Sequence, residues 1–158
     1  MRILVGVASR GAPELLRALD PLVSLSGQEL VLVHVLDNGA REEMELAGGR
    51  LRSRPIPRNR LREIGEAERQ AARAALDEAM EVALALGALP EALVEEGEPG
   101  AILCRRIEER DCDLAVVAPD TGRLTIRADP KSVGHTARFV LDHSPRPVLL
   151  IRGQLAAG

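Results

Sequence analysis

The sequence predicts one α/β domain built on a doubly wound, five-stranded parallel sheet in the strand order 3-2-1-4-5. Five short apolar runs alternate with segments in which apolar residues recur at helical spacing. The runs are nearly continuous in Val, Leu and Ile, as in strands buried on both faces of a parallel sheet. At 158 residues, the chain has the usual length of one domain with one core.

The predicted strands alternate with the predicted helices along the chain. They are residues 3–8, 30–36, 92–94, 114–118 and 148–151. The second run is interrupted only by His34, which we expect to be a neutral, hydrogen-bonded core residue. Each run ends at Gly, Pro or polar residues, which favour turns.

Four helices are predicted between these strands, over residues 13–24, 60–86, 101–110 and 130–143. Pro13 suits a first helical turn, whereas Pro21 is predicted to kink or end the first helix. Gly87 is a natural stop for the long second helix. Asp129 followed by Pro130 has the form of an N-cap and first turn for the last helix.

Residues 37–59 are polar and show no sustained period, and this length exceeds an ordinary connection. Residues 39–58 are therefore predicted to form a mobile lid within a domain of residues 1–153, with residues 154–158 as a tail. A basic run crosses this segment, consisting of Arg50, Arg52, Arg54, Arg58, Arg60 and Arg62. The run could clamp a polyanion, but glutamates flank it on both sides and favour a solvated, neutralised segment.

Composition excludes several classes of function. The net charge of −3 and the single aromatic residue, Phe139, argue against nucleic acid or an anionic membrane as partner. No run reaches the roughly 18 apolar residues of a spanning helix, and the first residues enter a strand directly. We therefore expect a cytoplasmic protein whose two cysteines, Cys104 and Cys112, are free thiols.

No residue pattern of a catalytic centre is found. His34, His135 and His143 have no carboxylate or cysteine at the spacing of a triad or a metal site. The sequence contains no Gly-x-Ser-x-Gly elbow, no Walker loop and no Gly-x-Gly-x-x-Gly turn. The expectation is a protein that is not an enzyme and binds no metal.

Several segments resemble the universal stress protein family, over about residues 2 to 152. They are Ile3-Leu4-Val5-Gly6-Val7, Leu32-Val33-His34-Val35, Gly97-Glu98-Pro99, Asp113-Leu114-Ala115-Val116-Val117, Ser132-Val133, and the stretch from His143 to Arg152. The resemblance implies the adenine nucleotide α hydrolase-like fold and pairing of the last strand with a second copy. In nucleotide-binding members it implies ATP at the carboxyl ends of the strands. There the family has a Gly-x2-Gly-x9-Gly-Ser loop around the phosphates and an aspartate after the first strand.

This chain departs from that pattern residue by residue. The aspartate position is Ala8, the loop glycines become Ala118, Thr121 beside Gly122, and Lys131, and the serine remains as Ser132. An N-cap carboxylate at Asp129 would compete with phosphate for amide donors. Cations on the loop could instead attract an anion by charge. The candidate binding positions are Ala8, Val35, Val117, Ala118, Thr121, Gly122, Arg123, Arg127, Lys131, Ser132 and Val133.

Two hypotheses about function follow. The first is a non-enzymatic regulatory module without cofactor, which acts in the stress response on an unidentified protein partner. It is a homodimer through the last strand, at Val148, Leu149, Leu150 and Ile151. The alternative is a switch that binds ATP or AMP weakly, or hydrolyses it slowly, at the carboxyl ends of the strands. A small anionic ligand on the basic loop is compatible with both.

Overall fold

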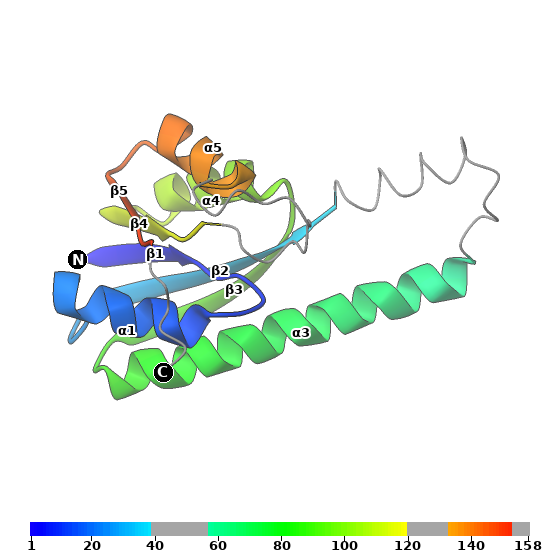
Figure 1. Cartoon of the computed structure of the whole chain (residues 1–158), viewed down its shortest axis with the longest axis horizontal. Coiled ribbons are helices and arrows are strands. Elements are labelled where there is room, and N and C mark those ends of the chain that lie inside the picture. The colour runs from blue at the N-terminus through cyan, green and yellow to red at the C-terminus, as the bar shows by residue number, and fades with distance from the viewer. Residues whose placement is uncertain (39–56, 120–132, 153–158) are drawn as a thin grey trace.

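The computed structural model describes residues 1–38, 57–119 and 133–152, and these residues form a five-stranded sheet in the order β3-β2-β1-β4-β5. The strands are β1 (Arg2–Gly6), β2 (Glu29–Asp37), β3 (Leu89–Gly97), β4 (Leu114–Val117) and β5 (Val148–Leu150). All four neighbouring pairs are parallel, as Figure 1 shows. The predicted fold class and strand order are confirmed.

Helices cover both faces of this sheet (Figure 1). They are α1 (Ala12–Val23), α3 (Arg58–Ala85), α4 (Pro99–Glu109) and α5 (His135–His143). Because side chains alternate along a strand, Ile3 and Val5 of β1 enter a cluster with α1 and α3, and Leu4 enters a second cluster with α4 and α5. The sheet is thus the middle of three layers, which explains why its inner strands are apolar on both faces.

The edge strand β3 is longer than predicted, nine residues in place of residues 92–94. It pairs along its whole length with β2, from Leu89 opposite Glu29 to Gly97 opposite Asp37. An edge strand needs a partner on one side only and can carry exposed polar residues, so its sequence lacks the apolar run of an inner strand. Pro90, which has no N–H to donate, is tolerated at such an edge.

Helix α1 does not end at Pro21 but continues to Val23. Pro21 lies in the last turn, where a missing N–H removes a single helical hydrogen bond. Asp20 then terminates the helix, because its carbonyl accepts from Ser24 N at 2.7 Å and its Oδ1 accepts from Leu25 N at 2.9 Å.

The starts of the other helices also differ from the prediction. Helix α3 begins at Arg58, and α4 begins at Pro99, directly after an N-cap at Glu98. Helix α5 begins at His135, with Gly134 (φ 82°) at its N-cap. The cap of α5 is therefore not Asp129, which lies outside the described residues together with Pro130. The predicted lid over residues 39–58 also falls outside them, except for its last two residues.

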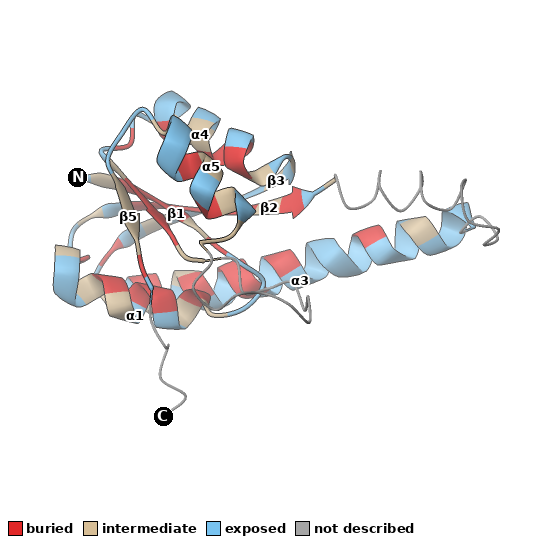
Figure 2. Cartoon of the chain, turned by 45° about the horizontal axis from the view of Figure 1, so that its top comes forward, coloured by how far each residue is buried: buried red, intermediate tan, exposed pale blue. Residues whose placement is uncertain are grey.

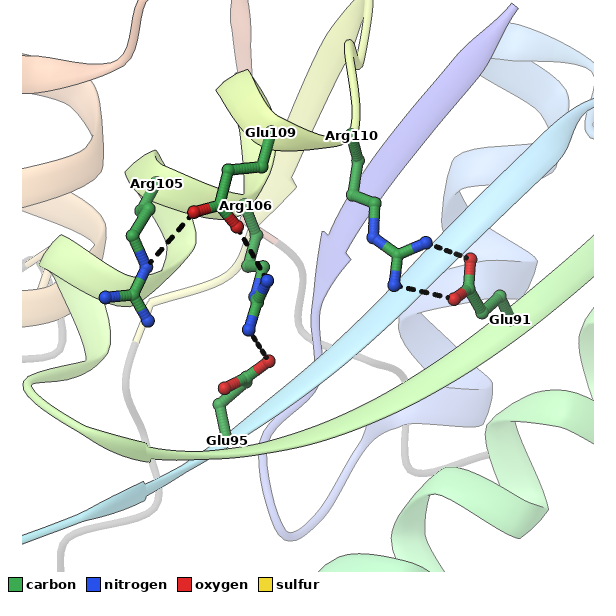
Figure 3. A network of polar contacts seen from close by, with 6 residues as sticks. All are labelled: Glu91, Glu95, Arg105, Arg106, Glu109 and Arg110. Carbon is green, nitrogen blue, oxygen red and sulfur yellow. Dashed lines mark hydrogen bonds and ion pairs between the residues drawn. The ribbon is translucent and has the colours of Figure 1, made fainter.

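A row of ion pairs connects the edge strand β3 to helix α4 (Figure 3). Arg106 lies between Glu95 of β3, at 2.5 Å, and Glu109 of α4, at 2.6 Å. Arg110 contacts Glu91, closer to the start of β3, at 2.9 Å. Because Arg106 lies on α4 and Arg110 is its C-cap, and both reach the same strand, they fix the edge of the sheet against that helix.

Helix α3 extends beyond the sheet, with its N-terminal turns away from the body of the protein (Figures 1 and 2). Apart from Gly65, its buried residues lie in the second half, at Ala72, Ala75, Leu76, Ala79 and Ala83. Arg58, Arg60 and Arg62 are exposed in the first turns, as expected of a solvated basic run. None of the described helices has the length and apolarity required to cross a bilayer.

Candidate functional site

The carboxyl ends of β1, β2 and β4 lie at the same end of the parallel sheet. Strand β1 has β2 on one side and β4 on the other, so the chain changes direction across the sheet between β1 and β4. Open α/β sheets bind ligands outside the carboxyl ends of their strands at such a switch point. This edge is therefore the candidate site, and the predicted residues can be compared with it.

Five of the predicted binding residues are described, and all lie at or next to these strand ends. Val35, Val117 and Val133 belong to the same apolar cluster, on the α4 and α5 face, with Val117 buried. Ala8 follows β1 and is exposed, and Ala118 follows β4 and packs against the cluster on the other face. The remaining predicted positions lie outside the described residues, namely Thr121, Gly122, Arg123, Arg127, Lys131 and Ser132.

The first turn of α5 provides amide donors at this edge. Val133, immediately before the helix, packs in the same cluster as Val117 at the end of β4. Gly134 at the N-cap has no side chain that could accept the amide hydrogens of the first turn. The N-terminus of a helix carries a partial positive charge from its amide groups and favours anions. The N-cap is thus Gly134, whereas Asp129, which the sequence predicted as the cap, lies outside the described residues.

His34 adds a polar contact beneath the edge. The side chain is 6% exposed, and its Nδ1 lies 2.8 Å from the carbonyl oxygen of Val7, the residue that follows β1. Burial lowers the pKa of the imidazole below its ordinary value of 6.5. The ring is therefore neutral at pH 7, and the prediction of a hydrogen-bonded core histidine is confirmed.

The two thiols have the features of structural cysteines. Cys112 is buried and Cys104 is half-buried, and neither forms a disulfide. Burial raises the pKa of both thiols, so that little thiolate is present at neutral pH. Within the described ranges, no group of three or more His, Cys, Asp or Glu side chains could hold a metal ion.

A hollow of about 430 Å³ lies at the opposite, amino-terminal end of the sheet, between the starts of β2 and β3. Its charged side chains are already paired, because Arg2 contacts Glu29 at 2.7 Å and Arg110 contacts Glu91 at 2.9 Å. This hollow was not predicted, since residues far apart in the chain form it. Its paired charges offer little to a charged ligand.

A second hollow, of about 500 Å³, lies beside the carboxyl end of β2, where α3 passes the edge strand. Arg69 and Arg73 line it from the helix, and Glu96 lines it from β3. Arg69 contacts Glu96 at 2.7 Å. These residues were not predicted, because their positions on α3 follow no motif and their proximity to β3 depends on the helix packing.

The fold and the site together define a class of protein. It is a doubly wound α/β protein whose candidate ligand-binding edge lies at the switch point of the sheet. Within that class, the chain belongs to the universal stress protein family, whose sequence model matches residues 1–152. A comparison with curated proteins finds no match.

Solved structures of family members share the whole fold. A universal stress protein UspA from Lactobacillus plantarum is 21% identical with a TM-score of 0.72, over 96% of this chain and 97% of that one. One from Archaeoglobus fulgidus, in complex with dAMP, is 22% identical with a TM-score of 0.62, over 96% and 98%. One from Arabidopsis thaliana, with AMP bound, is 16% identical with a TM-score of 0.61, over 96% and 90%.

Proposed function

We propose that this protein is a regulatory binding module that takes an adenine nucleotide at the carboxyl ends of its strands and acts as a homodimer without catalysing a reaction. One observation above all supports the ligand: α5 starts at Gly134, which has no side chain of its own to cap the helix, and the preceding Val133 packs in the same cluster as Val117. Amide donors at a helix start are a ready site for a phosphate group. The same edge has the apolar side chains that a nucleoside needs for packing.

Two of the structures with the same fold support the class of ligand, since one was solved with dAMP and another with AMP. Both ligands are nucleoside monophosphates. A single helix start suits a single phosphate group, and this chain presents one such start next to the end of β4. We therefore expect a monophosphate to bind better than a triphosphate.

Of two substitutions relative to the family's motif, one supports the same preference and the other affects AMP and ATP alike. Ala118 stands where the resemblance implies a glycine, and its methyl group keeps the backbone from approaching a phosphate closely. Ala8 stands where it implies an aspartate and cannot accept a hydrogen bond from the ligand. Ala118 thus disfavours the distal phosphates of ATP, whereas Ala8 removes a contact to the nucleoside that AMP and ATP share.

Calorimetry with AMP and with ATP and Mg²⁺ tests this proposal. AMP should bind with a dissociation constant of about 100 µM, or about −5.5 kcal/mol, and ATP no more tightly than roughly 1 mM. His135→Glu should weaken AMP binding, because it places a carboxylate in the first turn of α5, where His135 is exposed. Gln70→Glu adds the same charge on the exposed side of α3 and should leave the affinity unchanged.

The proposal has distinct ways to fail. If AMP does not bind at millimolar concentration, the proposed ligand is wrong, and the protein is a module that works through protein contacts alone. Micromolar binding of ATP would show that the cations of the loop replace the missing glycines. Release of ADP from ATP in the same samples would contradict the non-catalytic part.

Contacts of two histidines and one serine support a non-catalytic protein. His34 Nδ1 is held by the carbonyl of Val7, and His143 Nδ1 lies 2.9 Å from the carbonyl of Phe139. Ser144 Oγ donates to the carbonyl of Arg146 at 2.8 Å. Each of these groups forms a structural hydrogen bond, and no pair of them joins a nucleophile to a base.

Strand β5 supports the homodimer. It is the last strand of the sheet, and no strand of the described residues lies along its outer side. Val148, Leu149 and Leu150 are half-buried in the single chain, whereas Ile151, just beyond the strand, is already buried. A second copy paired along this edge would cover the open backbone groups and close a two-fold assembly.

A further inference from the structure

The chain is fixed at two atoms where it leaves the sheet after β1. The N–H of Val7 donates to the carbonyl of Val33 at 2.8 Å, as in a continued ladder. The carbonyl of Val7 accepts instead from a side chain, the imidazole of His34, also at 2.8 Å. Beyond Val7, the chain passes Ala8 and bends at Ser9 to Gly11 (φ 83°), where α1 begins.

The chemistry of this contact assigns the proton. A carbonyl oxygen only accepts, so His34 Nδ1 must carry the hydrogen. His34 and Val7 are each 6% exposed, and an unmade hydrogen bond at such a buried carbonyl is costly. The neighbours of His34 on β2 are Val33, Val35 and Leu36, whose side chains have no donor, so the histidine alone offers one at this level of the strand.

We infer that His34 is a positioning residue of the candidate site: its imidazole holds the Val7 carbonyl and so sets the path of residues 8–11 beside the nucleotide-binding edge. The inference rests on the proposed function. His34 lies on the α1 and α3 face of β2, since it alternates with Val33 and Val35 of the opposite cluster. With Nδ1 bound to the Val7 carbonyl, it acts on the ligand through the path of residues 8–11.

Two variants of His34 test its hydrogen-bond donor separately from the size of its side chain. His34→Asn keeps an amide donor near the position of Nδ1, and His34→Leu keeps a side chain of similar size without a donor. His34→Leu should weaken AMP binding about tenfold and accelerate hydrogen exchange of the Val7 amide by a similar factor. His34→Asn should restore most of the AMP affinity and most of the protection of the Val7 amide. The exchange of the Val5 amide, within β1, should not change relative to global unfolding.

A matched control lies on the same strand. Leu30 is buried in the α1 and α3 cluster at the amino end of β2. Leu30→Val should lower the free energy of unfolding while AMP affinity and relative protection of the Val7 amide stay as in the wild type. If Leu30→Val reproduced the effects of His34→Leu, general destabilisation would account for both and the inference would be wrong.

The measurements also distinguish the inference from the proposed function. If the wild-type protein does not bind AMP, the proposed function fails, and exchange of the Val7 amide still tests His34. If His34→Leu does not fold, His34→Gln replaces it, because its longer side chain places the amide near Nε2 and not near Nδ1. Equal exchange and affinity in the Asn and Gln variants would then overturn the inference.

Discussion

Gly100 is a point of close contact between helices α4 and α5. A Cβ atom at this position would lie 2.7 Å from the Cβ, Cγ and Cδ1 atoms of Phe139. The preceding residue, Pro99, occupies the first position of α4, and Glu98 accepts from the amides of Gly100, at 3.2 Å, and Ala101, at 2.6 Å. The segment Gly97-Glu98-Pro99-Gly100 therefore starts α4 and admits the ring of Phe139.

Gly100→Ala should destabilise the protein, although alanine favours a helix by about 1 kcal/mol over glycine. The added methyl group must displace Phe139, which costs about 1 to 3 kcal/mol in a packed contact. Chemical denaturation measures the change in the free energy of unfolding. Phe139→Leu in the same chain should recover part of the loss, and additive effects of the two substitutions would contradict the contact.

Single residues differ in how far the sequence predicts them. His34 was predicted as a hydrogen-bonded core residue, because a polar group inside an apolar run must find a partner. Its partner could not be predicted, since the contact with Val7 depends on the register that pairs Val5 with Leu32. The candidate positions Ala8, Val35 and Val117 came from the family resemblance, and their assignment to a ligand stays a prediction.

The ion pairs of Arg105 and Arg106 on helix α4 differ in exposure, and only Arg106 reaches strand β3 (Figure 3). Arg106 contacts Glu95 and Glu109, and its side chain is 25% exposed. Arg105, the preceding residue on the same helix, is 54% exposed and lies 3.8 Å from Glu109. Water screens the second pair more strongly than the first.

Arg106→Ala should therefore lower the free energy of unfolding by about 1 to 2 kcal/mol, because it leaves the half-buried carboxylate of Glu95 without its partner. Arg105→Ala should change it by less than about 0.5 kcal/mol. Urea denaturation of both variants at low and high salt checks the difference. Equal effects of the two substitutions would show that the contact of Arg106 with β3 adds no stability.

Strands and helices were predicted to different degrees. The inner strands were found because burial on both faces makes them continuous apolar runs. Strand β3 was predicted too short, since Glu91, Glu95 and Glu96 conceal a strand at the edge of a sheet. The start of α5 was misplaced, because a proline after an aspartate is a common helix start, whereas Gly134 has no side chain to signal the cap.

The molecule has two sheet edges of different kinds. Strand β3 has nine residues and carries three glutamates, which pair with an arginine of α3, one of α4 and the C-cap arginine of α4. Strand β5 has three residues, all apolar. Charged side chains along an edge oppose pairing with another chain, whereas an apolar edge invites it. The two edges thus favour association through β5.

Leu150→Lys should convert the proposed dimer into a monomer, because two-fold pairing would bring each added charge near its mate in an apolar contact. Light scattering measures the mass at micromolar concentration. Leu150 also packs against the cluster beneath α4 and α5, so circular dichroism must show that the variant remains folded. Val94→Lys, at the exposed face of β3, is the control and should leave the mass unchanged.

The dimer proposal fails on either of two results. A wild-type protein that is monomeric at micromolar concentration would exclude association through β5. A Leu150→Lys protein that stays a folded dimer, or a Val94→Lys protein that becomes a monomer, would place the contact on another surface.

The central position of β1 has a consequence for how the chain is made. Residues 2–6 pair with residues 29–33 on one side, and residues 3–5 pair with residues 114–116 on the other. A ribosome adds roughly 5 to 20 residues per second. Strand β1 can therefore pair with β2, which in turn pairs with β3, several seconds before β4 is made and covers the other side of β1. During synthesis, the nascent sheet therefore exposes Ile3, Leu4 and Val5 along an open inner edge, where chaperones or another nascent chain can bind.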